Sequence, residues 1–158
     1  MGDHPQERCV LVVDDHAPLR TICRISLEQA GFRVTEAVDG DEALVSIAVE
    51  RPDVILLDVM MPRVSGWQVA ATLLEDRMTD DIPIIFITAR SGQADRLRAF
   101  DLGAQGFVVK PFDAAVLPRL ITSVLDEIER GERDAALADT IVDLRAERVI
   151  GAEHRLHT

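Results

Sequence analysis

The chain has 158 residues, which is the length of one ordinary domain and too short for two full ones. Its 28 acidic residues outnumber 17 basic ones, and the formal net charge is −11. Nucleic-acid phosphates and anionic lipids both attract basic surfaces, so this charge argues against direct binding to nucleic acid or to a membrane. All basic residues but one are arginines, and the single lysine is Lys110.

Hydrophobic residues make up 47% of the chain, which is enough for a sizeable core. No apolar run approaches the roughly 20 residues of a membrane span, and the N-terminus shows no secretory pattern. In such a chain the two cysteines, Cys9 and Cys23, are expected to be reduced core residues. These features favour a cytoplasmic protein.

The first part of the chain alternates strand and helix patterns twice. The continuous apolar run Cys9–Val13 predicts a strand covered on both faces. Apolar residues at helical spacing then predict a helix over Pro18–Gln29, which ends before a glycine. A short predicted strand, Phe32–Glu36, precedes a second helix over Asp41–Val49, for which Asp39 is the expected N-cap.

The remaining chain repeats this alternation three times. After a strand at Val54–Leu57, Ser65 begins an S-x-x-Q capping box and a helix to about Glu75. The later predicted elements are a strand at Ile82–Ile87, a helix at Gln93–Leu102, a strand at Phe107–Val109 and a long helix from Asp113 to Ile128. Alternating helices and doubly buried strands favour an α/β, doubly wound (βα)₅ sandwich with an open parallel sheet.

Four of the five predicted strands end at a polar residue. These residues are Asp14 with Asp15, Asp58, Thr88 and Lys110. The carboxyl ends of parallel strands share one edge of a sheet, and ligands of open α/β sheets bind there. The sequence therefore predicts one crevice that contains three carboxylates, a hydroxyl and an ammonium.

This set of groups indicates phosphoryl transfer. Three neighbouring carboxylates repel one another and need a cation to stay ionised together. An all-oxygen ligand set without a His/Cys cluster favours Mg²⁺, or Mn²⁺, over zinc. The ammonium of Lys110 and the hydroxyl of Thr88 can bind phosphoryl oxygens, and a carboxylate beside the metal can act as a nucleophile.

Four segments together resemble the response regulator receiver domain of two-component signalling. They are VVDDH, VILLDVMMP, IFITAR and FVVKPF, each of which includes one of the predicted strand ends. The resemblance spans residues 8–128 and implies a flavodoxin-like fold with strand order 2-1-3-4-5. Residues 129–158 are expected to form an acidic, helical C-terminal extension, because Leu137, Ile141 and Leu144 have helical spacing.

By this resemblance, Asp58 is the phosphoacceptor. A sensor histidine kinase or a phosphotransfer protein would donate the phosphoryl group from a phosphohistidine. The implied metal ligands are Asp14, Asp15, Asp58 and the backbone carbonyl of Met60. The implied protein is a signalling switch and not an enzyme in the ordinary sense.

The resemblance also implies a switching surface. Thr88 and Lys110 would contact the phosphoryl group, and Phe107 would change rotamer with it. The Lys110–Pro111 peptide bond would be cis. Residues 93–128 would then bind a downstream protein or a second copy of the chain.

Two alternatives remain open at this level. The chain could be the receiver fragment of a longer regulator whose output domain is missing. It could also be a phosphohydrolase with an aspartate nucleophile, although such enzymes usually show D-x-D and Met60 stands at the second aspartate position. For each residue an ordinary role is also available: a polar turn, a helix cap, a surface cation or, for Phe107, plain core.

Overall fold

The centre of the molecule is a five-stranded parallel sheet in the order β2-β1-β3-β4-β5. The structure is a computed structural model that describes residues 7–131. The strands are β1 (Cys9–Val13), β2 (Arg33–Ala37), β3 (Val54–Asp58), β4 (Ile84–Thr88) and β5 (Gly106–Val109). The alternating architecture and the strand order that the sequence and its family resemblance predict are confirmed.

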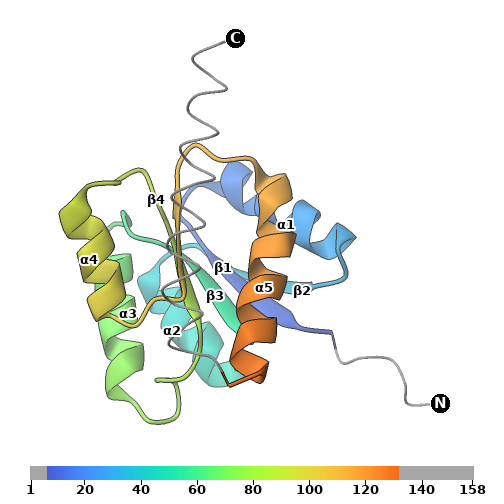
Figure 1. Ribbon diagram of the computed structural model, residues 1–158. Helices are drawn as coiled ribbons and strands as arrows, with labels where there is room; N and C mark the ends of the chain where they lie inside the picture. The colour runs from blue at the N-terminus through green and yellow to red at the C-terminus, as the bar shows by residue number, and fades with distance from the viewer. Residues whose placement is uncertain (1–6, 132–158) are drawn as a thin grey trace.

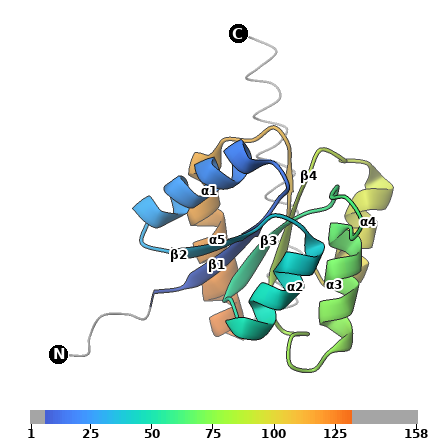
Figure 2. The ribbon, with the colours of Figure 1, turned by 180° about the vertical axis from the view of Figure 1, so that it is seen from behind.

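Helices cover both faces of this sheet, as Figures 1 and 2 show from opposite sides. One face is covered by α1 (Ala17–Gln29) and α5 (Leu117–Glu129). The other is covered by α2 (Gly40–Val49), α3 (Gly66–Glu75) and α4 (Gln93–Asp101). Coverage on both faces explains why the central strands are continuous apolar runs and not alternating ones.

The three central strands, β1, β3 and β4, are buried at every position. Their side chains include Leu11, Ile55 and Phe86, which are among the largest fully buried side chains of the described residues. Strand β2 lies at the edge and is only partly buried. The polar residues at the carboxyl ends of β1, β3 and β4 are therefore positioned by fully buried strands.

Two helix starts form as the sequence predicts. The Asp39 side chain accepts a hydrogen bond from the Glu42 N–H at 2.8 Å, which caps α2. Ser65 and Gln68 make both hydrogen bonds of a capping box at the start of α3. These caps satisfy backbone N–H groups that have no partner within the helix.

The last helix begins later than the sequence predicts. Asp113 caps a short 3₁₀ turn, η1 (Ala114–Val116), and the α-helix starts only at Leu117. The reason is Pro118, which has no N–H to donate to the Ala114 carbonyl. A proline is accommodated in the first turn of a helix, so α5 starts directly before it.

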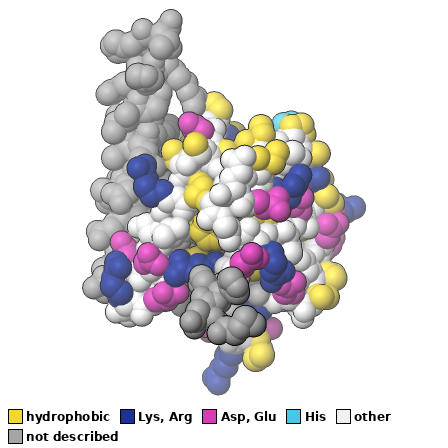
Figure 3. Space-filling view, turned by 90° about the vertical axis from the view of Figure 1, so that its right-hand side faces the viewer, with side chains coloured by type: hydrophobic (Ala, Val, Ile, Leu, Met, Phe, Trp, Pro, Cys, Tyr) yellow, Lys and Arg dark blue, Asp and Glu magenta, His cyan; other side chains and the backbone are white. Residues whose placement is uncertain are grey.

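Within residues 7–131, no helix is both long and apolar enough to cross a lipid bilayer. On the face drawn in Figure 3, Lys and Arg side chains lie among Asp and Glu side chains and form no separate basic patch. Of the predicted C-terminal extension, the part from residue 132 onward lies outside the described residues.

Candidate functional site

Three carboxylates meet at the carboxyl edge of the sheet. Asp14 follows β1 with Asp15 next to it, and Asp58 is the last residue of β3. One side-chain oxygen of each lies within 4.8 Å of the others. Asp14 and Asp58 are 1% and 2% exposed, whereas Asp15 is exposed to solvent. The structure therefore brings together the three acidic residues that the strand ends predict.

Lys110, directly after β5, supplies a positive charge to this cluster. Its Nζ lies 2.8 Å from Asp14 Oδ2 and 3.5 Å from Asp58 Oδ1. Burial lowers the pKa of Lys110, but the hydrogen bond to Asp14 and the charges of Asp58 and Asp14 outweigh it, so the pKa is raised above its ordinary value. The peptide bond from Lys110 to Pro111 is cis.

Asp58 is difficult to ionise where it lies. Burial, followed by the negative charge of Asp14, raises the pKa of Asp58 to about 6. The charge of Lys110 and the Met60 N–H, which lies 3.3 Å from Asp58 Oδ1, act in the opposite direction. Two buried carboxylates thus share one ammonium, and within residues 7–131 no second cation forms an ion pair with either of them.

The ligand chemistry of this cluster fits a hard divalent cation. All three candidate side chains offer carboxylate oxygens, which Mg²⁺ and Mn²⁺ prefer. The Asp14 Oδ2 atom is buried and lies 2.8 Å from the Lys110 ammonium, with which it forms an ion pair. An acidic triad of this kind is typical of the Mg²⁺ site of receiver domains.

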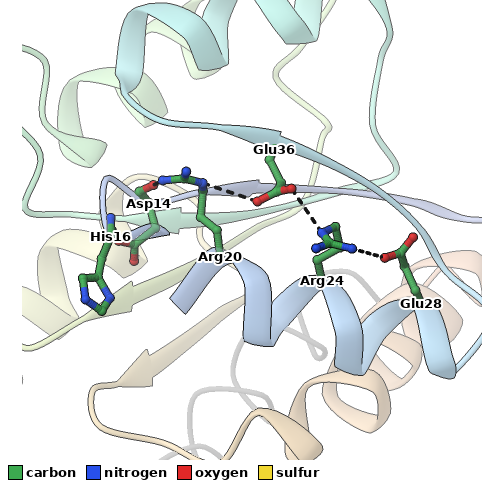
Figure 4. Close-up of polar contacts among 6 residues, drawn as sticks. All are labelled: Asp14, His16, Arg20, Arg24, Glu28 and Glu36. Atoms are coloured by element: carbon green, nitrogen blue, oxygen red, sulfur yellow. Dashed lines mark hydrogen bonds and ion pairs between the residues drawn. The ribbon is translucent and has the colours of Figure 1, made fainter. Parts of the chain in front are cut away.

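The main chain of Asp14 is held on several sides (Figure 4). Its N–H donates to the Ala37 carbonyl of β2 at 3.2 Å, and its carbonyl accepts from Arg20 Nη1 at 2.7 Å. The Asp14 Oδ1 atom accepts from the His16 N–H at 2.8 Å. Sequence reasoning did not single out Arg20, because nothing in the pattern distinguishes it from the other arginines.

The backbone of Asp58 lies against the first residue of α3. A Cβ atom on Gly66 would be 2.2 Å from the Asp58 carbonyl oxygen, which is far inside van der Waals contact. The Gly66 N–H also donates to the Val59 carbonyl at 2.9 Å. Glycine is therefore required for the helix to approach the strand end this closely. The neighbouring capping box at Ser65 was the only sequence signal of this junction.

The other predicted site residues lie on β4 and β5. Thr88 ends β4 and is fully buried, and its Oγ1 accepts a hydrogen bond from the Arg90 N–H at 3.0 Å. Ile87 pairs with Asp58 in the sheet, so Thr88 lies one residue further along the same edge. Phe107 is buried in the core beside β4. The structure thus places Thr88 at the predicted edge, and places the Phe107 ring in the interior.

Trp67 packs behind this edge and joins three elements. Its ring centroid lies 4.7 Å from that of Phe86 on β4, and the Arg98 guanidinium of α4 lies 5.0 Å from the Trp67 centroid. Aromatic and cation–π contacts of this geometry stabilise the packing of α3 against β4 and α4. Trp67 therefore serves packing.

Comparisons with known proteins agree with this geometry. The response regulator receiver domain matches residues 10–122. The phosphate regulon transcriptional regulatory protein PhoB of Pseudomonas aeruginosa is 35% identical over 130 residues, which are 82% of this chain and 57% of that protein. The probable transcriptional regulator ycf27 of Cyanophora paradoxa is 42% identical over 120 residues, or 76% of this chain and 49% of that protein.

Solved structures show the same fold. The chemotaxis protein CheY4 of Vibrio cholerae has a TM-score of 0.70 at 31% identity, covering 73% of this chain and 97% of that one. The chain spans about half the length of the curated relatives it matches. Sheet order, acidic edge and sequence similarity together show that the chain belongs to the response regulator receiver domain family, whose members are signalling switches and not conventional enzymes.

Proposed function

We propose that Asp58 accepts a phosphoryl group from a phosphohistidine of a sensor histidine kinase or phosphotransfer protein, in the cytoplasm. The observation that carries this proposal is the position of the buried Asp58 carboxylate. It lies within 4.8 Å of ligand oxygens of Asp14 and Asp15, and its Oδ1 is 3.5 Å from Lys110 Nζ. A nucleophile, a cation site and a counter-charge thus converge where one phosphoryl group would be received.

The cation is Mg²⁺, or Mn²⁺, held by Asp14, Asp15, Asp58 and the backbone carbonyl of Met60. When bound, it neutralises charge on the phosphoryl oxygens and on the carboxylates. The support for it is the charge imbalance at the site, since two buried carboxylates are matched by a single ammonium. A cation balances this charge without disturbing the sheet.

The covalent step is a transfer between two nucleophiles. A side-chain oxygen of Asp58 attacks phosphorus, an O–P bond forms, and the N–P bond of the phosphohistidine breaks. The imidazole leaves and takes up a proton. Lys110 Nζ, 3.5 Å from Asp58 Oδ1, is positioned to bind an oxygen of the incoming group and to stabilise its charge.

The switch follows from contacts that exist only in the phosphorylated state. The phosphoryl group adds a charge of about −1.5 to −2, which the Thr88 hydroxyl and the Lys110 ammonium can bind. Such differential contacts are what shift an equilibrium between two conformations. Thr88 would release the Arg90 N–H and turn toward the phosphoryl group, and Phe107 would change rotamer with it.

The responding surface is residues 93–128, which include α4, β5 and α5. On α4 the side chains of Leu97 and Phe100 are 57% and 49% exposed. Exposed apolar side chains on neighbouring turns of one helix suit a protein interface. We assign this surface to a downstream protein partner or to a homodimer, within a receiver domain that spans residues 8–128 and precedes an acidic extension at 129–158.

The test is phosphorylation with acetyl phosphate and Mg²⁺, followed by intact-mass spectrometry. We expect one phosphoryl group per chain, stable in acid, released by hydroxylamine and absent in Asp58→Asn. The matched control is Asp101→Asn, which removes an exposed carboxylate at the end of α4 and should be phosphorylated normally. Rapid turnover of a small phosphate ester without an adduct, or an adduct that persists in Asp58→Asn, would contradict the proposal.

A second candidate is that this receiver regulates transcription as part of a longer protein. The observation in its favour is that the curated relatives are described as transcriptional regulators and are about twice as long as the matched region. With its net charge of −11, the present chain would not contact DNA itself. The complete reading frame of the gene tests this candidate, because a DNA-binding segment would have to follow or precede these residues.

A further inference from the structure

Arg20, in the first turns of α1, connects the acidic site to the edge strand β2. Its Nη1 donates to the Asp14 carbonyl oxygen at 2.7 Å, and its Nε lies 3.4 Å from Glu36 Oε1 (Figure 4). Only 14% of the Arg20 side chain is exposed. A largely buried guanidinium therefore bridges the main chain at the candidate metal site and a carboxylate on a different strand.

The end of β2 controls both polar groups of the Asp14 main chain. The Ala37 carbonyl accepts the Asp14 N–H at 3.2 Å. Glu36, the residue before it, holds Arg20, which in turn donates to the Asp14 carbonyl. The side chains of Asp14 and Asp15 project from this segment, so a displacement of the segment moves two of the three carboxylates.

An arginine suits this bridge for a geometric reason. Its planar fork presents Nη1 and Nε in a fixed relation. Arg20 donates a hydrogen bond from Nη1 to the Asp14 carbonyl, and its buried Nε faces Glu36 in an ion pair without a hydrogen bond. The ammonium of a lysine is a single centre on a flexible stem. A lysine at this position could keep one of the two contacts and would hold the segment less firmly.

Arg24, one turn further along α1, provides a matched comparison. Its Nε lies 3.3 Å from Glu36 Oε2, and its Nη1 donates to Glu28 Oε1 at 2.9 Å. The first contact reaches the same glutamate on β2 and the second runs along the helix, and neither involves Asp14, as Figure 4 shows. Removing Arg24 thus takes away a cation from the same glutamate without touching the acidic site.

We infer that Arg20 is a positioning residue for the divalent-cation site, acting through the Asp14–Asp15 segment with Glu36 as its anchor. The inference rests on the proposed function, since it concerns the cation that these carboxylates hold. Mutation of a group that orients metal ligands typically lowers metal affinity by about 10- to 100-fold. For Arg20→Met we expect the lower end of this range, because the ligands themselves remain.

The experiment measures Mn²⁺ binding to the full chain by electron paramagnetic resonance, with Mg²⁺ as competitor. Thermal unfolding in EDTA is recorded for every variant. Arg20→Met should raise the Mn²⁺ dissociation constant about tenfold, and Arg20→Lys should raise it by less. Arg24→Met should lower the thermal unfolding temperature about as much as Arg20→Met does. Its Mn²⁺ dissociation constant should stay within about twofold of wild type.

The outcomes separate this inference from the proposed function. Unchanged Mn²⁺ affinity in Arg20→Met, or equal losses in Arg20→Met and Arg24→Met, would overturn the inference alone. Failure of the wild-type chain to bind either cation would overturn both. Should Arg20→Met not fold, Glu36→Gln decides: it keeps Arg20 but weakens its anchor, and should raise the dissociation constant about threefold, whereas wild-type affinity would refute the inference.

Discussion

The two ends of the sheet each carry a cluster of opposite charges, and the clusters differ in burial. At the carboxyl edge, Lys110 Nζ lies 2.8 Å from Asp14 Oδ2, and both Asp14 and Asp58 are buried. At the amino edge, Arg8 Nη2 lies 3.0 Å from Asp126 and 2.9 Å from Glu129, whose side chains are 44% and 65% exposed. The distances are nearly equal, but the surroundings are not.

This difference indicates which cluster serves stability and which serves chemistry. Exposed ion pairs contribute little, but they also cost little, because both partners remain hydrated. Buried carboxylates lose their hydration, and a single nearby ammonium offsets that loss only in part. The carboxyl-edge cluster is therefore unfavourable for folding by itself and is explained by the cation and phosphoryl group it is proposed to bind.

Of the substitutions considered, Gly66→Ala is expected to disturb the carboxyl-edge cluster most. The new Cβ would lie 2.2 Å from the Asp58 carbonyl oxygen, so either α3 or the end of β3 must move. We expect a loss of about 3 kcal/mol in the free energy of unfolding, measured by urea denaturation.

The control for this variant is Gly92→Ala, before α4. A Cβ there meets only the flexible Asp95 carboxylate, at 3.3 Å. We expect a loss below about 1 kcal/mol, since alanine is a poor N-cap but causes no backbone clash. Similar losses in the two variants would show that the approach of α3 to Asp58 is not tight.

The next largest effect concerns the cost of burying Asp58. Its pKa is raised from 3.8 to about 6, so between these values the native state binds more protons than the unfolded state. The favourable contribution of the Asp58 carboxyl to the free energy of unfolding is therefore fully present at low pH, and it is lost as the pH rises through about 6. In EDTA, Asp58→Asn should be more stable than wild type near pH 7 by about 2 kcal/mol.

The pH series makes this prediction specific. The stability difference between Asp58→Asn and wild type should shrink toward zero near about pH 4, where the wild-type carboxyl is protonated. Added Mg²⁺ should also reduce this difference, because the wild-type protein keeps the Asp58 ligand and is stabilised more than the variant. A difference that does not change with pH or Mg²⁺ would mean that burial of the Asp58 charge is not its cause.

The residues of this edge were easier to predict than the contacts that support it. Asp14, Asp58, Thr88 and Lys110 follow apolar runs, and in a parallel sheet the chain direction alone brings such residues to one side. The pairing of Arg20 with Glu36 depends on how α1 lies over β2, which a single sequence does not reveal. The close approach of Gly66 likewise depends on the tilt of α3.

Helix boundaries were predicted less well for a related reason. Asp113 has the residue type of an N-cap for either a 3₁₀ turn or an α-helix, and its side chain accepts from Ala115 N in the structure. The choice between the two is made by Pro118, five residues later, through the hydrogen bond that it cannot donate. A pattern of apolar residues at helical spacing is the same in both cases.

A matched exchange of cations sharpens the comparison between the two ends. Lys110→Arg replaces a compact ammonium between two buried carboxylates with a wider planar group, and we expect phosphorylation by acetyl phosphate to slow by about tenfold, or ~1.4 kcal/mol. The fold should remain intact by circular dichroism. The control, Arg8→Lys, makes the reverse exchange at the amino edge and should leave the phosphorylation rate unchanged. A wild-type phosphorylation rate in Lys110→Arg would show that this position does not require a lysine.

The smallest expected effect is at the amino edge itself. Arg8 joins the start of β1 to the end of α5 through Asp126 and Glu129, and burial, which lowers the pKa of Arg8, is outweighed by these partners, which raise it. Arg8→Ala should nevertheless cost only about 0.5 kcal/mol, because water screens partly exposed pairs. This loss in the free energy of unfolding should decrease further at about 1 M salt, where the screening length is about 3 Å. A loss of several kcal/mol that persists in salt would place Arg8 with the buried cluster, and burial would then no longer explain why the two ends of the sheet differ.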